Sequence, residues 1–140
     1  MKKRHPNFSS TLAKRDLNHT LQELEMDNWG EVTFPSYLVQ TCHALRSKPL
    51  RDFTIEDLRI MIGQNIGLEY LVPLAIVHLQ HDPFVAGDFY PGDLLHNVLT
   101  VESSFWEQRQ DLRKAVECVI ASVPDFPKDF RKALLIFQKV

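Results

Sequence analysis

A chain of 140 residues has the length of one ordinary domain and can bury a core without disulfides or a structural metal. Its composition, 44% hydrophobic and 24% charged, is typical of a globular protein. With only 5 glycines and little Val or Thr alternation the chain is not sheet-rich, whereas its Leu, Ile and Phe residues recur every three or four positions, as in helices.

The first segment, residues 1–15, is predicted to be a flexible basic arm with a short helix near Ser10–Lys14. It begins MKKRHPNFSS, and because no apolar region follows these basic residues, we predict neither a signal peptide nor a membrane anchor. The remaining residues, 16–140, are expected to form a single helical domain.

Two helices are predicted next. Thr20 can cap a short helix over residues 21–27. After an extended stretch over residues 31–35, Ser36 is the expected N-cap of a helix over Tyr37–Arg46. The buried stripe of this helix is expected to contain three side chains, which are Leu38, Cys42 and Leu45.

Residues 53–80 contain the longest apolar run and are predicted to form a helix, a turn and a second helix. Thr54 and Asp57 have the spacing of a capping box, so the first helix is expected to begin directly after Thr54. Gly63 and Gly67 enclose the expected break, since glycine is costly inside a helix and easily adopts the left-handed conformation beyond its end.

The second helix of this stretch is predicted to be the central core helix, because it has almost no polar face. Proline is tolerated in the first turn of a helix, so Pro73 predicts regular helix over Val72–Gln80, with Leu68–Tyr70 as a separate turn. The helix is far shorter than the roughly 20 residues that cross a bilayer. Gln64 and Asn65, in the break before it, are expected to form a tight turn that bonds its own backbone.

Residues 81–93, HDPFVAGDFYPGD, are the most turn-rich segment and are predicted to form an ordered loop. Phe84, Phe89 and Tyr90 are too apolar for a mobile linker, so we expect them to hold the loop against the body. Three carboxylates are then expected to point outward, namely Asp82, Asp88 and Asp93.

Four helices are predicted after this loop from caps and apolar spacing. They cover Asp93 to about Leu99, Phe105–Gln108, Asp111 to about Ala121, and Lys128 to about Gln138. The last helix is expected to present four side chains to the core, which are Phe130, Leu134, Leu135 and Phe137. Trp29 and Trp106 are expected to be core residues or to staple helices. The predicted fold is an all-α, compact single-domain bundle of roughly six to eight short helices around a central apolar helix.

The formal net charge of −2 is informative only when it is divided along the chain. Between Arg59 and Arg109 there is no Lys or Arg. The acidic residues of this stretch are Glu69, Asp82, Asp88, Asp93, Glu102 and Glu107, and residues 16–31 repeat the pattern. Such segregation predicts a negative surface that attracts a basic partner, and the alternative is a solvated acidic face without a partner.

One of the functional alternatives is an enzyme, a small helical metal-dependent phosphohydrolase that uses His43, His78, His81 and Asp82. Imidazole and carboxylate groups bind divalent metals that lower the pKa of a bound water. Against this, Pro83 takes the His81–Asp82 pair out of a helix, and histidines often lie at a helix C-terminus, where they favour the dipole.

Other catalytic and binding patterns are not found in the sequence. Cys42 and His43 are neighbours on a helix and point about 100° apart, so they cannot form a thiolate–imidazole pair. Cys42 and Cys118 are predicted to be reduced, buried thiols. Neither phosphate-loop motif occurs, and the basic residues are mixed with acids and lack interleaved aromatics. We therefore predict no cofactor, no metal and no nucleic-acid partner.

A longer pattern extends from Trp29 to Trp106. It contains WGE, SYLVQTCHALRSKPL, FTIEDLRIMIGQNIGLEYLVPLAI and GDFYPGDLL, and it closes with FW. These phrases are too long and irregular to be chance helix patterning. They resemble the immunity proteins of bacterial contact-dependent growth inhibition systems over more than half of the chain.

The resemblance implies a small cytosolic helical protein that binds and neutralises a toxin domain delivered by a neighbouring cell, often a nuclease, without catalysis of its own. It implies a monomer in a one-to-one complex with the cognate toxin domain, and no membrane association. Many nuclease active sites are basic, so we expect the inhibitor to dock through carboxylates with an aromatic anchor. The expected docking residues are Glu23, Glu25, Asp27, Asp82, Asp88, Phe89, Tyr90 and Asp93.

Overall fold

The computed structural model describes residues 14–30 and 36–139, and in these ranges it contains helices and loops but no β-strand. The all-α prediction is therefore confirmed. The α-helices are α1 (Leu21–Leu24), α2 (Tyr37–Arg46), α3 (Ile55–Gly63), α4 (Leu68–His81), α5 (Asp93–Leu99), α6 (Ser103–Gln108), α7 (Gln110–Ala121) and α8 (Arg131–Gln138). Three 3₁₀ helices accompany them, η1 (Lys14–Asn18), η2 (Leu50–Asp52) and η3 (Lys128–Phe130). Most of the predicted basic arm and the extended stretch 31–35 lie outside the described residues.

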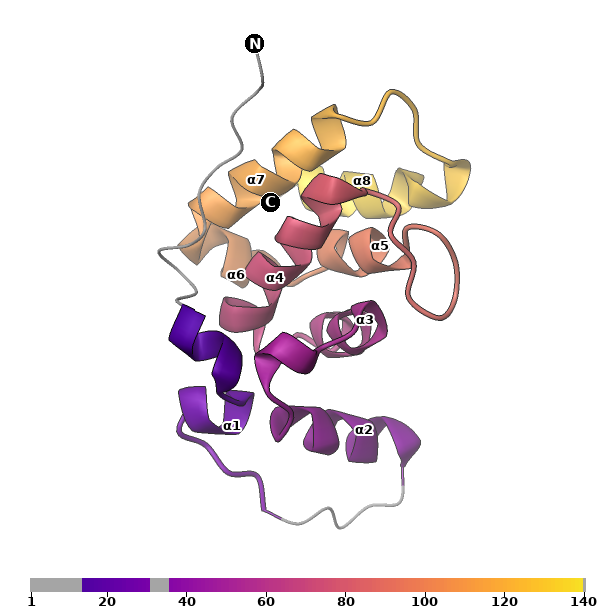
Figure 1. Cartoon of the computed structure of the whole chain (residues 1–140). Coiled ribbons are helices and arrows are strands. Elements are labelled where there is room, and N and C mark those ends of the chain that lie inside the picture. The colour runs from indigo at the N-terminus through magenta and orange to yellow at the C-terminus, as the bar shows by residue number, and fades with distance from the viewer. Residues whose placement is uncertain (1–13, 31–35, 140) are drawn as a thin grey trace.

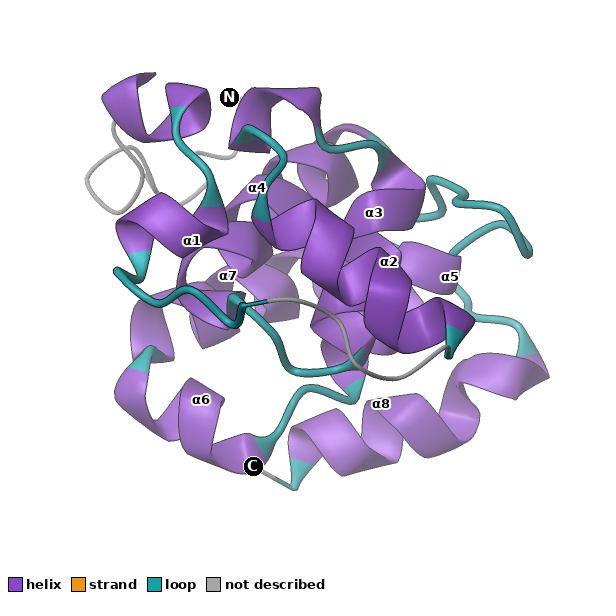
Figure 2. Ribbon diagram, turned by 90° about the horizontal axis from the view of Figure 1, so that it is seen from below, coloured by secondary structure: helices purple, strands orange, loops and turns teal. Residues whose placement is uncertain are grey.

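The helix α4 is the centre of the bundle, as predicted. It packs against α3, α5 and α7, and its side chains Leu71, Val72, Ala75, Ile76 and Leu79 are fully buried. The helices α7 and α8 lie at one end of the molecule, and α2 lies at the other end (Figure 1). Seen from below, α2 lies across this end of the bundle and packs on α3 (Figure 2). The loop from α4 to α5 projects to one side of the bundle (Figure 1).

The start of α4 corrects one prediction. The helix is continuous from Leu68, so the prediction that regular helix begins at Val72 is wrong, and Pro73 lies at the sixth helical position. Proline there removes one helical N–H, which costs stability. Burial of Leu68 and Leu71 keeps the preceding turn helical in spite of this cost. Gly67 caps the helix in the left-handed conformation (φ +63°), as expected for a break at this glycine.

The break between α3 and α4 is also held by a contact from far along the chain. Asn65 adopts a positive φ of 55°, and its side-chain Oδ1 accepts a hydrogen bond from the backbone N–H of Glu102 at 3.1 Å. The turn also bonds its own backbone, as predicted, through the N–H groups of Gln64 and Asn65. Asn65 thus attaches the α3–α4 turn to the start of α6. Asn65 and Glu102 are 37 positions apart in the sequence, so local sequence patterns cannot predict this contact.

Most helix boundaries and inward faces follow the predictions, with several differences. The helix α6 begins at Ser103 and not at Phe105, and residues 128–130 form the 3₁₀ helix η3 ahead of α8. The helix α1 ends at Leu24, before Met26 with its positive φ of 53°. The side chains of Leu38 and Leu135 are 42% and 51% exposed, and Cys118 is only half-buried. A regular apolar spacing marks a stripe on the helix, but a neighbour covers only part of that stripe on the short peripheral helices α2 and α8. No helix of the described chain is long and apolar enough to cross a bilayer.

Candidate functional site

The loop between α4 and α5 is closed at its base by aromatic rings. The Asp82 carboxylate accepts a hydrogen bond from the backbone N–H of Phe84 at 3.0 Å. The Phe84 ring then packs against the rings of Phe126 and Phe130, each at a centroid distance of 5.7 Å. Phe84 therefore holds the loop against the body, as predicted. Gly92 has a φ of +88° beside the Phe84 and Phe130 rings, where a side chain would find no space.

Asp93 does not point outward, so that expectation is wrong. It is the first residue of α5 and only 1% exposed, and it turns back into the loop. Its carboxylate accepts hydrogen bonds from the N–H groups of Gly87 at 2.6 Å and Phe89 at 3.1 Å, and a longer one from Tyr90 at 3.4 Å. A buried carboxylate needs such donors, and a turn of several residues can supply them. Asp93 therefore organises the loop and is not part of its outer surface.

Glu56 and Arg59 on α3 hold the other side of the loop. Glu56 accepts the backbone N–H of Asp88 at 2.9 Å and the Arg59 Nε–H at 2.6 Å. The Arg59 guanidinium lies over the Phe89 ring, 4.1 Å from its centroid. The backbone of the loop is thus bound while the Phe89 side chain stays 70% exposed and Asp88 faces solvent. Phe89, which was expected to hold the loop against the body, contacts Arg59 there but leaves most of its ring exposed.

The Glu56–Arg59 pair predicts a pH-dependent stability. The hydrogen bond from Arg59 lowers the pKa of Glu56 below its ordinary value of 4.5. A carboxyl group whose pKa is depressed in the folded state stabilises the fold above its ordinary pKa, and this stability is lost as the pH falls through the folded-state value. Glu56→Gln is therefore expected to lower the free energy of unfolding by about 1 kcal/mol at pH 7. The difference should shrink in urea titrations below pH 4.5, and a constant difference down to pH 3 would contradict the assignment.

A groove lies beside this loop, between α2 and α3. Its volume is about 850 Å³. Tyr37, Leu38 and Thr41 of α2 line one side, Ile60 of α3 lies in its lining, and Phe89 belongs to the loop side. Tyr37 is 81% exposed. The groove therefore has an aromatic ring on each flank, which is the kind of anchor that protein interfaces favour.

The acidic residues around α1 have structural partners. Glu23 completes a capping box with Thr20 and contacts His19 at 3.3 Å. Glu25 forms an ion pair with Arg46, whose guanidinium also stacks on Trp29 at 4.3 Å and donates to the backbone carbonyl of Asp27. The contacts of Arg46 attach the residues that follow α1 to α2.

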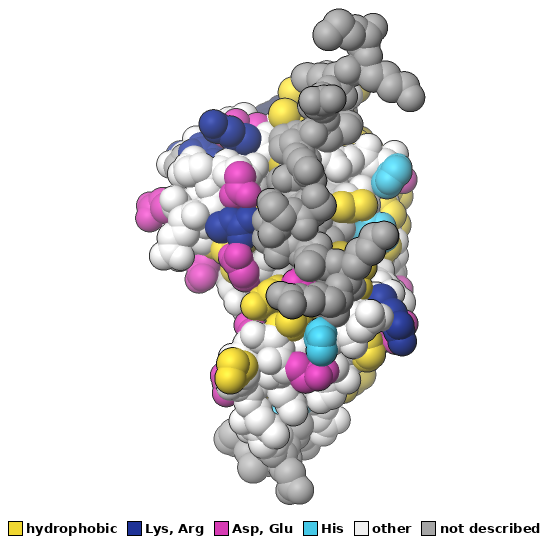
Figure 3. Space-filling view, turned by 60° about the vertical axis from the view of Figure 1, so that its left-hand side comes forward, with side chains coloured by type: hydrophobic (Ala, Val, Ile, Leu, Met, Phe, Trp, Pro, Cys, Tyr) yellow, Lys and Arg dark blue, Asp and Glu magenta, His cyan; other side chains and the backbone are white. Residues whose placement is uncertain are grey.

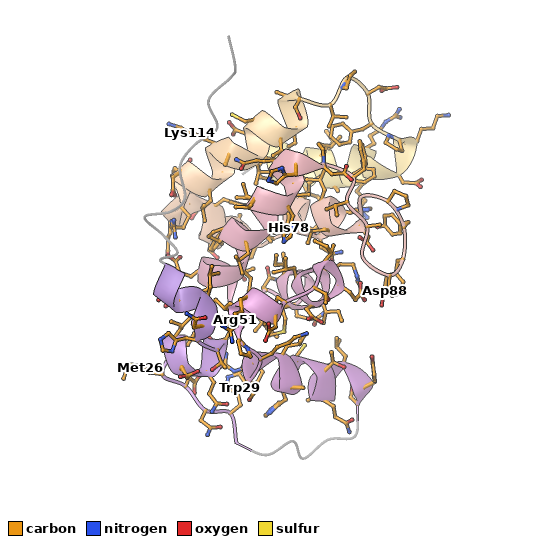
Figure 4. All side chains as sticks on the ribbon, viewed as in Figure 1. Met26, Trp29, Arg51, His78, Asp88 and Lys114 are labelled. Atoms are coloured by element: carbon orange, nitrogen blue, oxygen red, sulfur yellow. The ribbon has the colours of Figure 1, made fainter. Side chains whose placement is uncertain are left out.

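The two predicted acidic sets do not share one surface. Met26, next to Glu25 and Asp27 in the sequence, lies at the lower left of the molecule, whereas Asp88 lies on the loop at the right (Figure 4). The structure brings Asp82, Asp88, Phe89 and Tyr90 together in one loop. Tyr90 is 41% exposed, and its hydroxyl group is hydrogen-bonded to His96 at 2.7 Å.

The stretch without Lys or Arg is less negative in space than in the sequence. The arginines at its two ends contact carboxylates within it, since Arg59 lies 3.9 Å from Asp93 and Arg109 forms an ion pair with Glu69. On the face shown in Figure 3, acidic side chains are interspersed with Lys, Arg and His among the described residues, without one continuous acidic patch. In the described chain, Asp88 has no cation in ion-pair contact.

The residues of the enzymatic alternative do not converge. His43 on α2 packs edge-on against Trp29 at a centroid distance of 5.3 Å, while His78 and His81 lie in the last turn of α4. Asp82 is used in the loop turn described above. Among the described residues, no three His, Cys, Asp or Glu side chains form a group that could hold a metal ion. Partial burial and the neighbouring His81 lower the pKa of His78, which favours its neutral form.

Comparison with protein families gives an independent result. A family model described as CDI immunity proteins matches residues 23–116, which is more than half of the 140-residue chain. The matched segment runs from the last residues of α1 through α2 to α6 into α7, and it includes the loop that Asp93 and Glu56 hold in place. A comparison with curated proteins finds no match. The match agrees with the resemblance carried by the phrases between Trp29 and Trp106, and the chain belongs to the family of CDI immunity proteins, those of contact-dependent growth inhibition.

Proposed function

We propose that this protein binds the toxin domain of a contact-dependent growth inhibition system and neutralises it, and that this toxin domain is a nuclease. The observation that carries the proposal is the family match over residues 23–116. Nucleases hold phosphate with cationic groups, so an inhibitor that presents carboxylates gains encounter rate and specificity. The solvent-facing Asp82 and Asp88 on the loop are consistent with this.

The proposed mode of action is stoichiometric binding. The protein acts in the cytoplasm as a monomer, in a one-to-one complex with the toxin domain, and it needs no cofactor and performs no catalysis. We place the docking surface at Asp82, Asp88, Phe89 and Tyr90, which belong to the α4–α5 loop on one side of the bundle (Figure 1). Asp93 is left out because it is buried. Asp27 and the two glutamates of the α1 region form at most a second, separate contact.

The test uses the toxin domain encoded beside the gene of this chain. We expect the two purified proteins to form a one-to-one complex in size-exclusion chromatography with light scattering. An equimolar amount of this protein should stop the digestion of nucleic acid by the toxin domain, and its expression should protect cells that produce the toxin. Absence of both complex and protection would contradict the proposal. A complex with a toxin that digests neither RNA nor DNA would contradict the nuclease assignment alone.

A further inference from the structure

The groove between α2, α3 and the α4–α5 loop has the features of a binding surface for a protein partner. Tyr37 and Phe89 are among its lining residues, and they are 81% and 70% exposed. Leu38, 42% exposed, and the partly buried Ile60 add apolar area between them. With a volume of about 850 Å³, the groove can accept several side chains of a partner.

The loop side of the groove is preorganised. The backbone N–H groups of residues 87–89 are bound by the carboxylates of Asp93 and Glu56, as described above. Arg59 covers one face of the Phe89 ring. A loop that already has its bound conformation loses little conformational entropy on docking, so its exposed side chains contribute more of their contact energy to affinity. This distinguishes the loop from the exposed apolar side chains Leu135 and Ile136 on α8, to which nothing in the structure assigns a partner.

The charges of the groove select the partner. Its lining contains the acidic side chains Glu56, Asp57 and Asp88 against one basic side chain, Arg59. Glu56 is paired with Arg59, and Asp57 accepts a hydrogen bond from Lys48 at 2.6 Å. The hydrogen bond to Glu56 is the main cause that raises the pKa of Arg59, and Asp88 adds only to its electrostatic surroundings, since no described cation forms an ion pair with Asp88. The groove therefore has one carboxylate available at its rim, next to an exposed aromatic ring.

We infer that this groove receives a basic segment of the toxin domain, with an Arg or Lys side chain of the toxin pairing with Asp88 while its aliphatic stem lies between Tyr37 and Phe89. The inference rests on the proposed function and adds the site and the chemistry of the partner. A long cationic side chain suits the groove because it places methylene groups on the aromatic rings and its charge on the carboxylate. Arginine suits it best, since its planar guanidinium pairs with carboxylates through two hydrogen bonds.

The test compares surface variants of the full-length protein by the Kd for the purified toxin domain. Asp88→Lys is expected to weaken binding roughly 100-fold, through faster dissociation because the ion pair is lost and through slower association at low salt. Phe89→Ala and Tyr37→Ala are each expected to weaken it about 10-fold. Two matched controls lie outside the groove. Glu107→Lys makes the same charge reversal on α6, and Leu135→Ala removes an exposed apolar side chain from α8. Both controls should bind within about threefold of the wild type.

The possible outcomes distinguish failure of the proposed function from failure of the groove assignment. Melting curves should show every variant folded, because all substituted side chains are exposed. If the wild type does not bind the toxin domain, the proposed function and this inference both fail. If the wild type binds tightly and the three groove variants match the controls, only the groove is wrong. A further outcome would also overturn the inference. If the free protein is a dimer, and if Phe89→Ala or Tyr37→Ala makes it monomeric without loss of toxin affinity, the groove binds a second copy of the chain.

Discussion

Asp93→Ala is expected to lower the free energy of unfolding by about 3 kcal/mol and to free the backbone of residues 87–90. The substitution leaves the N–H groups of Gly87 and Phe89 without their acceptor, and the longer bond from Tyr90 is lost as well. Arg59 loses a carboxylate 3.9 Å away but keeps Glu56. The carboxylate also lies at the start of α5, where the helix dipole favours negative charge.

Urea denaturation measures the global effect, and amide hydrogen exchange measures the local one. In Asp93→Ala the amides of residues 87–90 should exchange much faster than in the wild type, while those of α4 stay protected under native conditions. Asp93→Asn is the matched control, because it keeps one acceptor oxygen and the volume of the side chain. It should cost less, about 1–2 kcal/mol. Unchanged exchange of residues 87–90 in Asp93→Ala would show that the carboxylate does not hold the loop.

Trp106→Ala is expected to lower the free energy of unfolding by about 3–5 kcal/mol. The side chain is fully buried and is among the largest of the core. Its ring contacts Phe105 and, at right angles, Phe137 of α8, with a centroid distance of 5.4 Å to the latter. The substitution would leave a cavity where α6 meets α8, and short helices cannot close such a cavity without moving their backbones.

Trp106→Phe provides the control for this prediction. The indole Nε1–H is buried without a hydrogen-bond partner among the described residues, so replacing the indole by a phenyl ring removes an unsatisfied donor as well as some packing. We expect Trp106→Phe to cost about 1 kcal/mol, because the two effects oppose each other. A similar loss of stability in Trp106→Phe and Trp106→Ala would mean that the indole nitrogen has a partner. A loss below about 1 kcal/mol in Trp106→Ala would show that the site repacks.

Together these contacts separate two roles within one short loop. Asp93 and Phe84 face inward and determine its conformation, whereas Asp88 and Phe89 face outward and remain available to a partner. Variants of the first pair should lose stability, and variants of the second should lose affinity while they remain folded. Both pairs lie in the segment that matches the family model, which spans residues 23–116.

The sequence alone was sufficient for most of the local structure. The N-cap at Thr20, the capping box at Thr54, the break before Gly67 and the helix over Tyr37–Arg46 are formed as predicted, because each depends on residues within one or two helical turns. The apolar spacing of residues 68–80 likewise identified the central helix. Pro73 was the exception, since burial of the preceding turn outweighed a local preference.

Only the tertiary structure decided which carboxylates are available to a partner. A sequence shows that Asp88 and Asp93 lie in one acidic loop, but it does not show that α3 supplies Glu56 and Arg59 to one side of that loop. Nor does it show that Asp93 turns inward, that Arg46 engages Glu25, or that Tyr37 faces the same groove as Phe89. The contacts of Glu56, Arg46 and Tyr37 join side chains that lie tens of residues apart, and Asp93 turns inward only because the folded loop brings three backbone N–H groups to its carboxylate. Pairing of charge and burial of polar groups are set by the folded arrangement and not by local propensity.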